Sequence, residues 1–225
     1  FESDFTNAKF TGADLTNADL SYGSDFTNAD FVSATLTGAD LKGADFTKAD
    51  FTKADLTNAD LSYGSDFTDA NFTEAVLKDA DLSGSYGSYG SYGSVGSNFT
   101  NANFSGADLT NADLSYGNFA NANFTDAILS NAYISYANFA NADFTGADLS
   151  NLMDAAYANF TGANFYNATY SEDINFGDIV FNPPSPISEE PSSPISEDQR
   201  FSSTFSNELF IGDGEGVGIN GADAT

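Results

Sequence analysis

Several residue types are absent from this chain of 225 residues. It has no cysteine, no histidine and no tryptophan, and Met153 is its single methionine. Without cysteine there are no disulfide bonds or thiolate metal sites, and the redox compartment cannot be inferred from cysteine usage. With no cysteine, no histidine and no isolated pair of acidic residues, the sequence gives little indication of catalysis. No apolar run approaches the roughly 18–20 residues that a membrane-spanning helix needs.

Basic residues are also scarce. Six Lys and Arg face 33 Asp and Glu, which gives a net charge of −27. Residues 97–176 contain eight acidic residues and no basic residue. A chain with this charge is not expected to bind the phosphates of nucleic acids or of anionic membranes. It could bind basic proteins, or compete with nucleic acid for them.

The large apolar residues recur every five positions, beginning with Phe5, Phe10, Leu15 and Leu20. We call each of them the centre of a five-residue unit. A spacing of five fits neither the 3.6-residue period of a helix nor the alternation of a flat strand. A small residue, usually alanine, stands two positions before each centre and points to the same side of an extended segment. Each unit therefore directs one small and one large side chain inward and then turns a corner.

The order of the centres predicts how the units are arranged. It runs Phe, Phe, Leu, Leu and repeats about every twenty residues, which indicates a coil with four faces. We number the faces one to four in this order. Phe should stack on Phe and Leu on Leu in successive coils. About eight coils at the roughly 4.8 Å spacing of neighbouring strands predict a rod roughly 38 Å long.

The units ADLTN, ADFTG, ANFTD and ADLSY resemble the A(D/N)LXX signature of pentapeptide-repeat proteins, over about residues 3–176. The resemblance implies an all-β fold, a right-handed quadrilateral parallel β-helix. We expect this solenoid to span residues 1–176. Residues 177–225 contain all five prolines and many acids, and are expected to form an extended tail. An apolar cluster at 201–211 should either cap the last coil or bind a partner: Phe201, Phe205, Leu209 and Phe210.

The repeat is interrupted at the corner between faces four and one. One extra residue lies in each of the segments 20–26 and 61–67, and twelve lie in 82–99, which holds the insertion loop at 83–97. We place the extra residue near Met153 at the same corner. Insertions in solenoids often mark the binding side. The tyrosines of this corner are the candidate partner-binding residues: Tyr22, Tyr63, Tyr86, Tyr89, Tyr92, Tyr116 and Tyr136.

The residue before each centre points outward and is usually Asp or Asn. Two faces carry acidic ladders: Asp4, Asp25, Asp45 and Asp66 on face one, and Asp19, Asp40, Asp60, Asp81 and Asp113 on face four. Neighbouring carboxylates in water repel by about 1 kcal/mol. We therefore expect raised pKa values and a solenoid that mild acidification stabilises. Because the acids recur in every coil, they indicate a ladder. We predict no catalytic residue, no cofactor and no dedicated metal site.

Together these features predict a non-enzymatic accessory or scaffold subunit that docks on a larger protein assembly. Family members are abundant in cyanobacteria and plastids, some in the thylakoid lumen. The resemblance therefore favours the lumenal side of a photosynthetic complex, with a cytoplasmic location as the alternative. Because the sequence begins with Phe1 rather than Met, we expect a processed chain or a fragment. The resemblance also offers a second function, DNA mimicry with binding to a type II topoisomerase. Ranks of outward threonines leave ice binding as a remote third.

Overall fold

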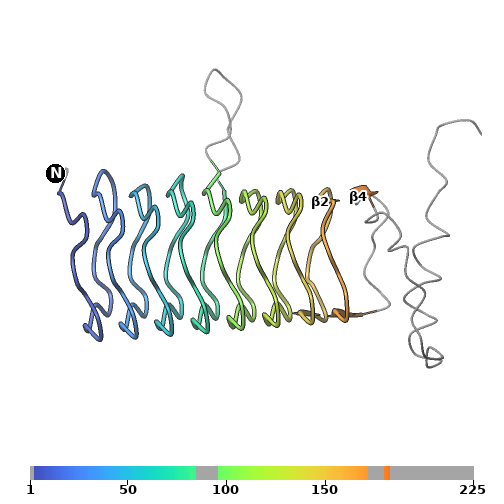
Figure 1. Cartoon of the computed structure of the whole chain (residues 1–225), viewed down its shortest axis with the longest axis horizontal. Coiled ribbons are helices and arrows are strands. Elements are labelled where there is room, and N and C mark those ends of the chain that lie inside the picture. Colours follow the sequence, from blue (N-terminus) through green and yellow to red (C-terminus); the bar gives the residue numbers. More distant parts are fainter. Residues whose placement is uncertain (1–2, 85–95, 172–179, 183–225) are drawn as a thin grey trace, which may run out of the picture. The chain divides into compact units, whose positions relative to one another are not determined.

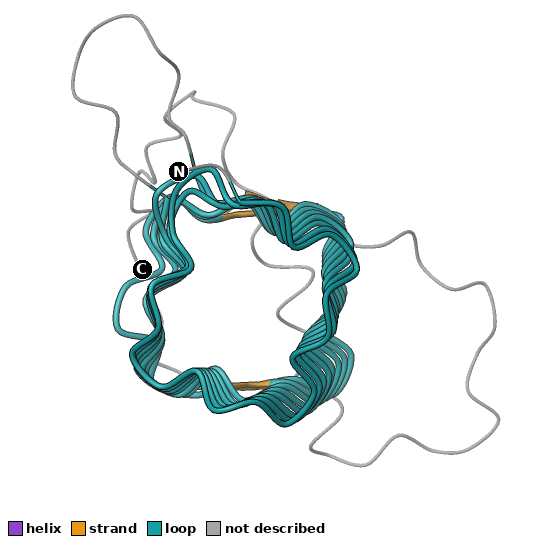
Figure 2. Cartoon of the chain, turned by 90° about the vertical axis from the view of Figure 1, so that its left-hand side faces the viewer, coloured by secondary structure: helices purple, strands orange, loops and turns teal. Residues whose placement is uncertain are grey.

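The computed structural model describes residues 3–84, 96–171 and 180–182. Contacts divide the chain into two units, Phe1–Pro184 and Ser185–Thr225. The second unit lies wholly outside the described residues. Seven of the predicted binding residues also lie outside them: Tyr86, Tyr89, Tyr92, Phe201, Phe205, Leu209 and Phe210. Within the first unit the chain winds into stacked coils, and the view along their axis shows a four-sided outline (Figures 1 and 2).

Parallel bridges join successive coils at the residue before each centre, and they form four columns. The predicted faces therefore match the bridged columns. The column of face one is Asp4, Asp25, Asp45, Asp66, Asn98, Asn118, Asn138 and Asn159, and that of face four is Asp19, Asp40, Asp60, Asp81, Asp113, Tyr133 and Asp154. The segment that a coil contributes to one face is short, and in most coils only one of its residues bridges to the next coil. Most of the described chain therefore consists of short extended segments and turns.

The described residues include four short strands, all near the end of the solenoid. They are β1 (Asp148–Leu149), β2 (Asn159–Thr161), β3 (Thr169–Tyr170) and β4 (Val180–Asn182). β1 pairs in parallel with β3, with Asp148 opposite Thr169. β2 pairs in parallel with β4, with Asn159 opposite Val180. Both pairs extend the columns of faces three and one by one more coil.

A tight turn forms each corner. In the first, the N–H of Ala8 donates to the carbonyl oxygen of Phe5 at 2.8 Å, and Asn7 between them has a φ of 58°. A positive φ strains most residues, whereas Gly and Asn adopt it more readily. The recurrence of Asn and Gly two positions after the centre therefore follows from the turn. The next alanine points inward again and begins the following face.

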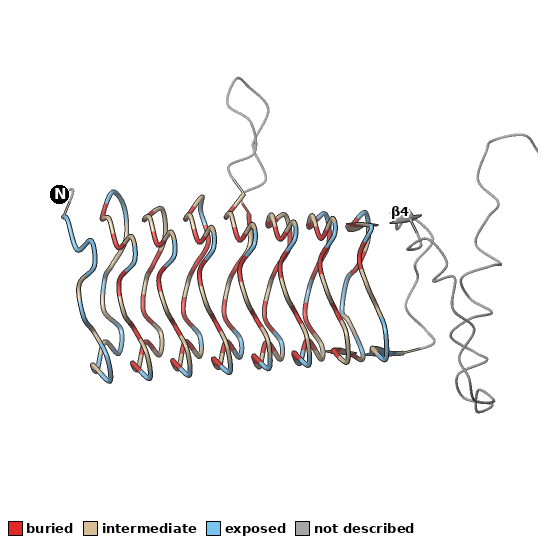
Figure 3. Cartoon of the chain, in the orientation of Figure 1, coloured by how far each residue is buried: buried red, intermediate tan, exposed pale blue. Residues whose placement is uncertain are grey.

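Ladders of phenylalanine fill half of the interior. On face one, Phe46 and Phe67 stack with ring centroids 4.9 Å apart and planes 3° apart. The rings of Phe67 and Phe72 on the adjacent face are tilted by 55° at 5.6 Å. Alanines and leucines complete a core in which most members are fully buried (Figure 3). Among the described residues, every buried side-chain nitrogen and oxygen has a hydrogen-bond partner.

The predicted position of the extra residue near Met153 was wrong. Asp154 bridges to Tyr133 on face four, six residues after Asp148 and five before Asn159. The extra residue therefore lies at the corner between faces three and four. Its position is set by packing, because Leu152 reaches the core while Ala155 takes the centre of face four. The Met153 side chain is left 58% exposed.

Candidate functional site

Tyrosine occupies an unusual position at the corner between faces four and one. Five tyrosines hold the turn position with positive φ there, at values from 39° to 66°: Tyr22, Tyr63, Tyr116, Tyr136 and Tyr157. Equivalent turns at the other corners mostly use Asn, Gly, Asp or Lys. A bulky residue in the left-handed region costs about 1–2 kcal/mol. Strain that recurs at one corner suggests a functional reason for the side chain.

Three of these side chains form a continuous stack, which we call the tyrosine stack. The rings of Tyr116 and Tyr136 lie 4.9 Å apart at 4°, and those of Tyr136 and Tyr157 lie 4.8 Å apart at 21°. Tyr136 and Tyr157 remain 48% and 55% exposed. The stack thus shows polarizable aromatic surface to solvent on a rigid backbone. Sequence reasoning missed Tyr157, although its place three residues after Asp154 matches that of Tyr116 after Asp113.

The other two tyrosines of the corner are separate from the stack. Tyr22 and Tyr63 are 55% and 62% exposed. Gly43 lies between them in the column, and a Cβ on this glycine would approach the Tyr22 ring to 2.9 Å. The glycine therefore makes room for the Tyr22 ring to lie along the column.

The ends of the insertion meet closely at the same corner. A Cβ on Gly84 would overlap the carbonyl oxygen of Tyr116 and lie 2.8 Å from Cα of Gly96. The Ser97 hydroxyl donates to the carbonyl oxygen of Ser83 at 3.1 Å and joins the two ends. We call these residues the neck of the insertion. The chain leaves and re-enters the solenoid at one point, so the order of faces resumes at Phe99 as the sequence predicted.

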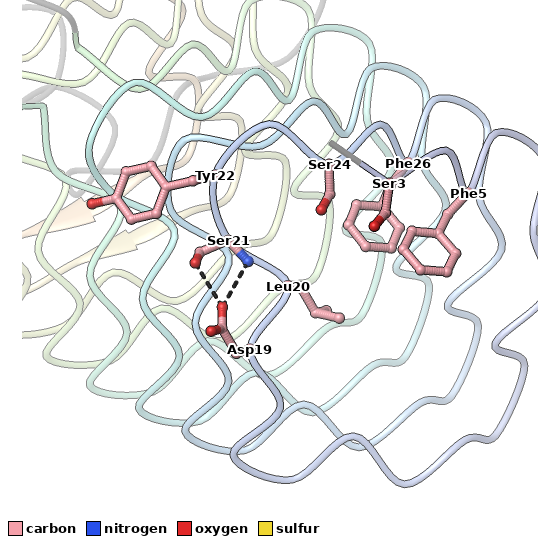
Figure 4. A pocket seen from close by; sticks show the side chains of 8 residues that line it. All are labelled: Ser3, Phe5, Asp19, Leu20, Ser21, Tyr22, Ser24 and Phe26. Carbon is pink, nitrogen blue, oxygen red and sulfur yellow. Dashed lines mark hydrogen bonds between the residues drawn. The ribbon is translucent and has the colours of Figure 1, made fainter. Parts of the chain in front are cut away.

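The acidic ladders lie in columns, but their electrostatics differ from the prediction. In the first coils the hydroxyl and N–H of the residue two positions on donate to the carboxylate, as Ser21 does to Asp19 at 2.6 and 3.1 Å (Figure 4). These hydrogen bonds favour the ionised form. The Thr or Ser hydroxyl, followed by the backbone N–H, lowers the pKa of four carboxyls in the first coils: Asp4, Asp14, Asp19 and Asp25.

Two partly buried carboxyls behave in the same way. Burial alone would raise the pKa of Asp108, but hydrogen bonds from Thr110 and Lys78 outweigh it and the pKa is lowered. Burial likewise opposes hydrogen bonds from Ser150 and Ser130 at Asp148, and the pKa is again lowered. The expectation of raised pKa values was therefore wrong at each carboxyl with a resolved shift. The turn donors outweigh repulsion along the column.

Lys42 neutralises part of the face-four column. Its Nζ lies 3.1 Å from Oδ2 of Asp40 and 3.2 Å from Oδ2 of Asp60. Hydrogen bonds to Asp40 and then to Asp60 raise the pKa of Lys42. The negative charge along this column is therefore not uniform, because Asp40 and Asp60 are already paired with Lys42.

Comparison with known proteins agrees with the coil geometry. The model of pentapeptide repeats matches in eight copies over residues 2–22, 24–62, 63–86, 95–115 and 118–151. The chain belongs to the pentapeptide-repeat family. Proteins of this family fold as right-handed quadrilateral β-helices and are generally structural or interaction proteins rather than enzymes.

Several solved pentapeptide-repeat structures are similar to this chain. A trypsin-treated form of QnrB1, a plasmid-mediated fluoroquinolone resistance protein, is 18% identical over 76% of this chain and 89% of its own, with a TM-score of 0.36. HetL from the cyanobacterium Nostoc sp. strain PCC 7120, involved in heterocyst differentiation regulation, is 29% identical, with coverages of 74% and 82% and a TM-score of 0.20. No curated protein matches.

A pentapeptide-repeat protein from the Arabidopsis thaliana thylakoid lumen is also similar. It is 27% identical over 64% of this chain and 67% of its own, with a TM-score of 0.20. All three TM-scores lie below 0.5, so the repeat model alone carries the family assignment.

Other candidate chemistry is weak in the described part of this pentapeptide-repeat protein. The described residues contain no group of three or more acids suited to hold a metal ion. They also contain no helix long and apolar enough to cross a membrane. A hollow lies at the first described coil (Figure 4). It is lined by Ser3, Phe5, Asp19, Leu20, Ser21, Tyr22, Ser24 and Phe26. It brings together no set of residues with evident catalytic chemistry.

Proposed function

We propose that this pentapeptide-repeat protein is a non-enzymatic interaction subunit that binds a larger protein assembly through the corner between faces four and one. The tyrosine stack is the observation that carries the proposal. Its side chains occupy turn positions with positive φ, which Asn or Gly would adopt with less strain. Tyrosine offers a large contact area and loses little conformational entropy on binding.

The surroundings of the stack support the same role. Exposed tyrosines at Tyr22 and Tyr63 extend the aromatic column, and the neck of the insertion opens beside Tyr116. A loop inserted at one corner of a solenoid is a common way to build a binding side. The repeat provides a rigid support, because every coil is hydrogen-bonded to the next. The remaining predicted residues of the loop and tail belong to this proposal as additional contacts.

As the setting we propose the lumenal side of a photosynthetic assembly, with the cytoplasm as the alternative. The acidic, cysteine-free composition suits such a scaffold, and family members occur in this compartment. In this proposal the solenoid of about eight coils is an accessory subunit and the acidic ladders help to orient it.

A matched pair of variants tests the proposed binding corner. We expect Tyr136→Asn combined with Tyr157→Asn to abolish capture of the assembly from the source organism after cross-linking. Asn holds the same turn position elsewhere, as at Asn121 and Asn141, so the fold should be kept. Tyr166→Thr removes a 64% exposed tyrosine from face two and is the control. Equal capture by all proteins would contradict the proposal.

The acidic columns favour one alternative function, DNA mimicry directed at a type II topoisomerase. Face four presents bridged carboxylates in successive coils from Asp19 to Asp113. A regular row of negative charge can imitate a phosphate backbone. Against this, Lys42 neutralises part of the row, and face one changes from Asp to Asn after Asp66. Inhibition of gyrase supercoiling by micromolar protein would favour the alternative, whereas no effect would contradict it.

The outward threonines give little support to ice binding. Several of their hydroxyls donate within their own turn, as Thr57 does to Oδ1 of Asp55 at 2.6 Å. A hydroxyl committed to a neighbouring carboxylate is less available to order water. Thermal hysteresis measurements would test this remote alternative directly.

A further inference from the structure

We propose that the tyrosine stack and two carboxylates beside it bind a basic, proline-rich segment of a partner protein. The segment would lie along the solenoid axis in the polyproline II conformation, with Lys or Arg at every third residue. This inference rests on the proposed function and specifies the chemistry of the partner.

The site consists of two parallel columns across three coils. Asp113 bridges to Tyr133, and Tyr133 bridges to Asp154, so these residues follow one another on face four. The tyrosine stack runs three residues further along each coil. Tyr133 is 41% exposed and therefore adds a fourth aromatic side chain, between the two acids. One column therefore presents an acid, an aromatic residue and an acid in successive coils. The column beside it, the tyrosine stack, is entirely aromatic.

Both acids have an oxygen available for a cation. Oδ1 of Asp113 accepts the N–H of Ser115 at 2.9 Å, and Oδ1 of Asp154 accepts the N–H of Ala156 at 3.0 Å. In the described segments, neither carboxylate forms an ion pair. This contrasts with Asp40 and Asp60, which share Lys42. The absence of any Lys or Arg in residues 97–176 leaves this part of the surface without a basic residue of its own.

The spacing of the acids selects the conformation of the occupant. Two coils separate Asp113 from Asp154, which corresponds to about 10 Å at the usual spacing of neighbouring strands. In a polyproline II helix, residues three apart lie on the same side and are separated by about 9 Å. In a β-strand, residues on the same side are separated by about 7 or 13 Å. The polyproline II spacing is the better match.

The aromatic column suits the same occupant. Proline-rich segments dock on aromatic side chains, and their preformed conformation reduces the entropy lost on binding. The exposed rings of Tyr136 and Tyr157 thus supply the apolar contact, while Asp113 and Asp154 supply charge complementarity.

Charge disfavours the other occupants of this surface. A second copy of the chain also carries −27, and the chain's own proline-rich segment, NPPSPISEEPSSPISED, is acidic. Either would bring like charges together beside Asp113 and Asp154. Nucleic acid is disfavoured for the same reason. A cationic protein segment is the occupant whose charge complements the site.

Synthetic peptides test the proposal with the full-length protein. We expect a fluorescein-labelled peptide of three Arg-Pro-Pro repeats to bind at least about threefold more tightly than a peptide of the same composition with its three arginines adjacent. Fluorescence anisotropy at low salt measures both affinities, since exposed ion pairs are screened by salt. Equal affinities would show that charge alone drives binding and would overturn the proposal.

Variants locate the binding. The double variant Asp113→Asn with Asp154→Asn should lower the affinity for the Arg-Pro-Pro peptide about tenfold. The double variant Tyr136→Asn with Tyr157→Asn should lower it by a similar factor. Asp143→Asn is the control, because it removes one charge from face two, where the neighbouring Asn123 and Asn164 show that an amide fits. An equal loss of affinity in the control, or no loss in the two double variants, would overturn the proposal that the peptide binds at this site. If the peptide results fail but Tyr136→Asn with Tyr157→Asn still abolishes capture of the assembly, the proposed function stands and only the chemistry of the partner is wrong.

Discussion

Nδ2 of Asn98 lies 3.3 Å from Oδ1 of Asp66 in the preceding coil of face one. At this contact the outward column changes from carboxylates to amides. An amide donates and accepts, whereas an ionised carboxylate only accepts. Beyond the contact the amides therefore form a hydrogen-bonded ladder across coils, with Asn118 donating to Asn98 at 3.1 Å and Asn138 to Asn118 at 2.9 Å. The amide ladder stabilises the second half of the solenoid without adding charge.

We expect Asn118→Asp to destabilise the solenoid by about 1–2 kcal/mol. The change removes the donor that reaches Oδ1 of Asn98 and Oγ1 of Thr100, and it places a charge within the ladder. Urea unfolding at pH 7 measures the loss. Asn17→Asp is the control, because Asn17 is exposed and Asp79 holds the same turn position in a later coil. Similar losses in both variants would mean that added charge, rather than the ladder, causes the effect.

Acid is expected to destabilise the solenoid. The pKa values of Asp108 and Asp148 are lower in the folded protein than the ordinary value of 3.8. A carboxyl with a lowered folded pKa stabilises the fold above its unfolded pKa, and this stabilisation is lost as the pH falls through the folded value. The urea midpoint should therefore be similar at pH 7 and pH 5 and should fall below about pH 4.

Asp108→Asn provides the control for this pH dependence. The amide retains Oδ1 as an acceptor for the N–H of Thr110 but cannot titrate. The variant should lose less stability between pH 5 and pH 2.5 than the unmodified protein. A solenoid that becomes more stable on acidification would restore the hypothesis of raised pKa values.

The sequence predicted the fold because the inward residues recur every five positions in all but a few units, and the interruptions preserve the order of the faces. The order beginning with Phe5, Phe10, Leu15 and Leu20 already requires four faces, and the bridges follow it. The extra residue near Met153 could not be placed in this way. A gap of one residue fits either side of face four, and only the packing of Leu152 and Ala155 decides between them.

The candidate site was only partly predictable for related reasons. Tyr116 and Tyr136 were recognised at the corner, but Tyr157 follows the misplaced residue and was missed. The signs of the pKa shifts depend on donors that the turn aims at each carboxylate, as at Asp19. Counting charges along a column cannot reveal these hydrogen bonds.

The neck of the insertion should be intolerant of side chains. We expect Gly84→Asn to destabilise the solenoid by about 1–3 kcal/mol, because even its Cβ would overlap the carbonyl oxygen of Tyr116. Gly12→Asn is the matched control, since nothing lies within 4 Å of a Cβ there and Asn7 holds a similar turn. Thermal unfolding followed by circular dichroism compares them. Equal midpoints would show that the neck adapts to a side chain.

Removal of a ring from the middle of a phenylalanine ladder should cost more than removal at its first described member. Phe72 is fully buried and stacks on Phe51 at 4.9 Å and on Phe104 at 4.8 Å. We expect Phe72→Ala to destabilise the solenoid by about 3–5 kcal/mol, since it leaves a cavity between two rings. Phe5 is 38% exposed, and among the described residues it stacks along its face only on Phe26, so Phe5→Ala should cost about 1 kcal/mol. Urea unfolding measures both losses, and equal values would contradict the idea that each ring is stabilised by the coils on either side.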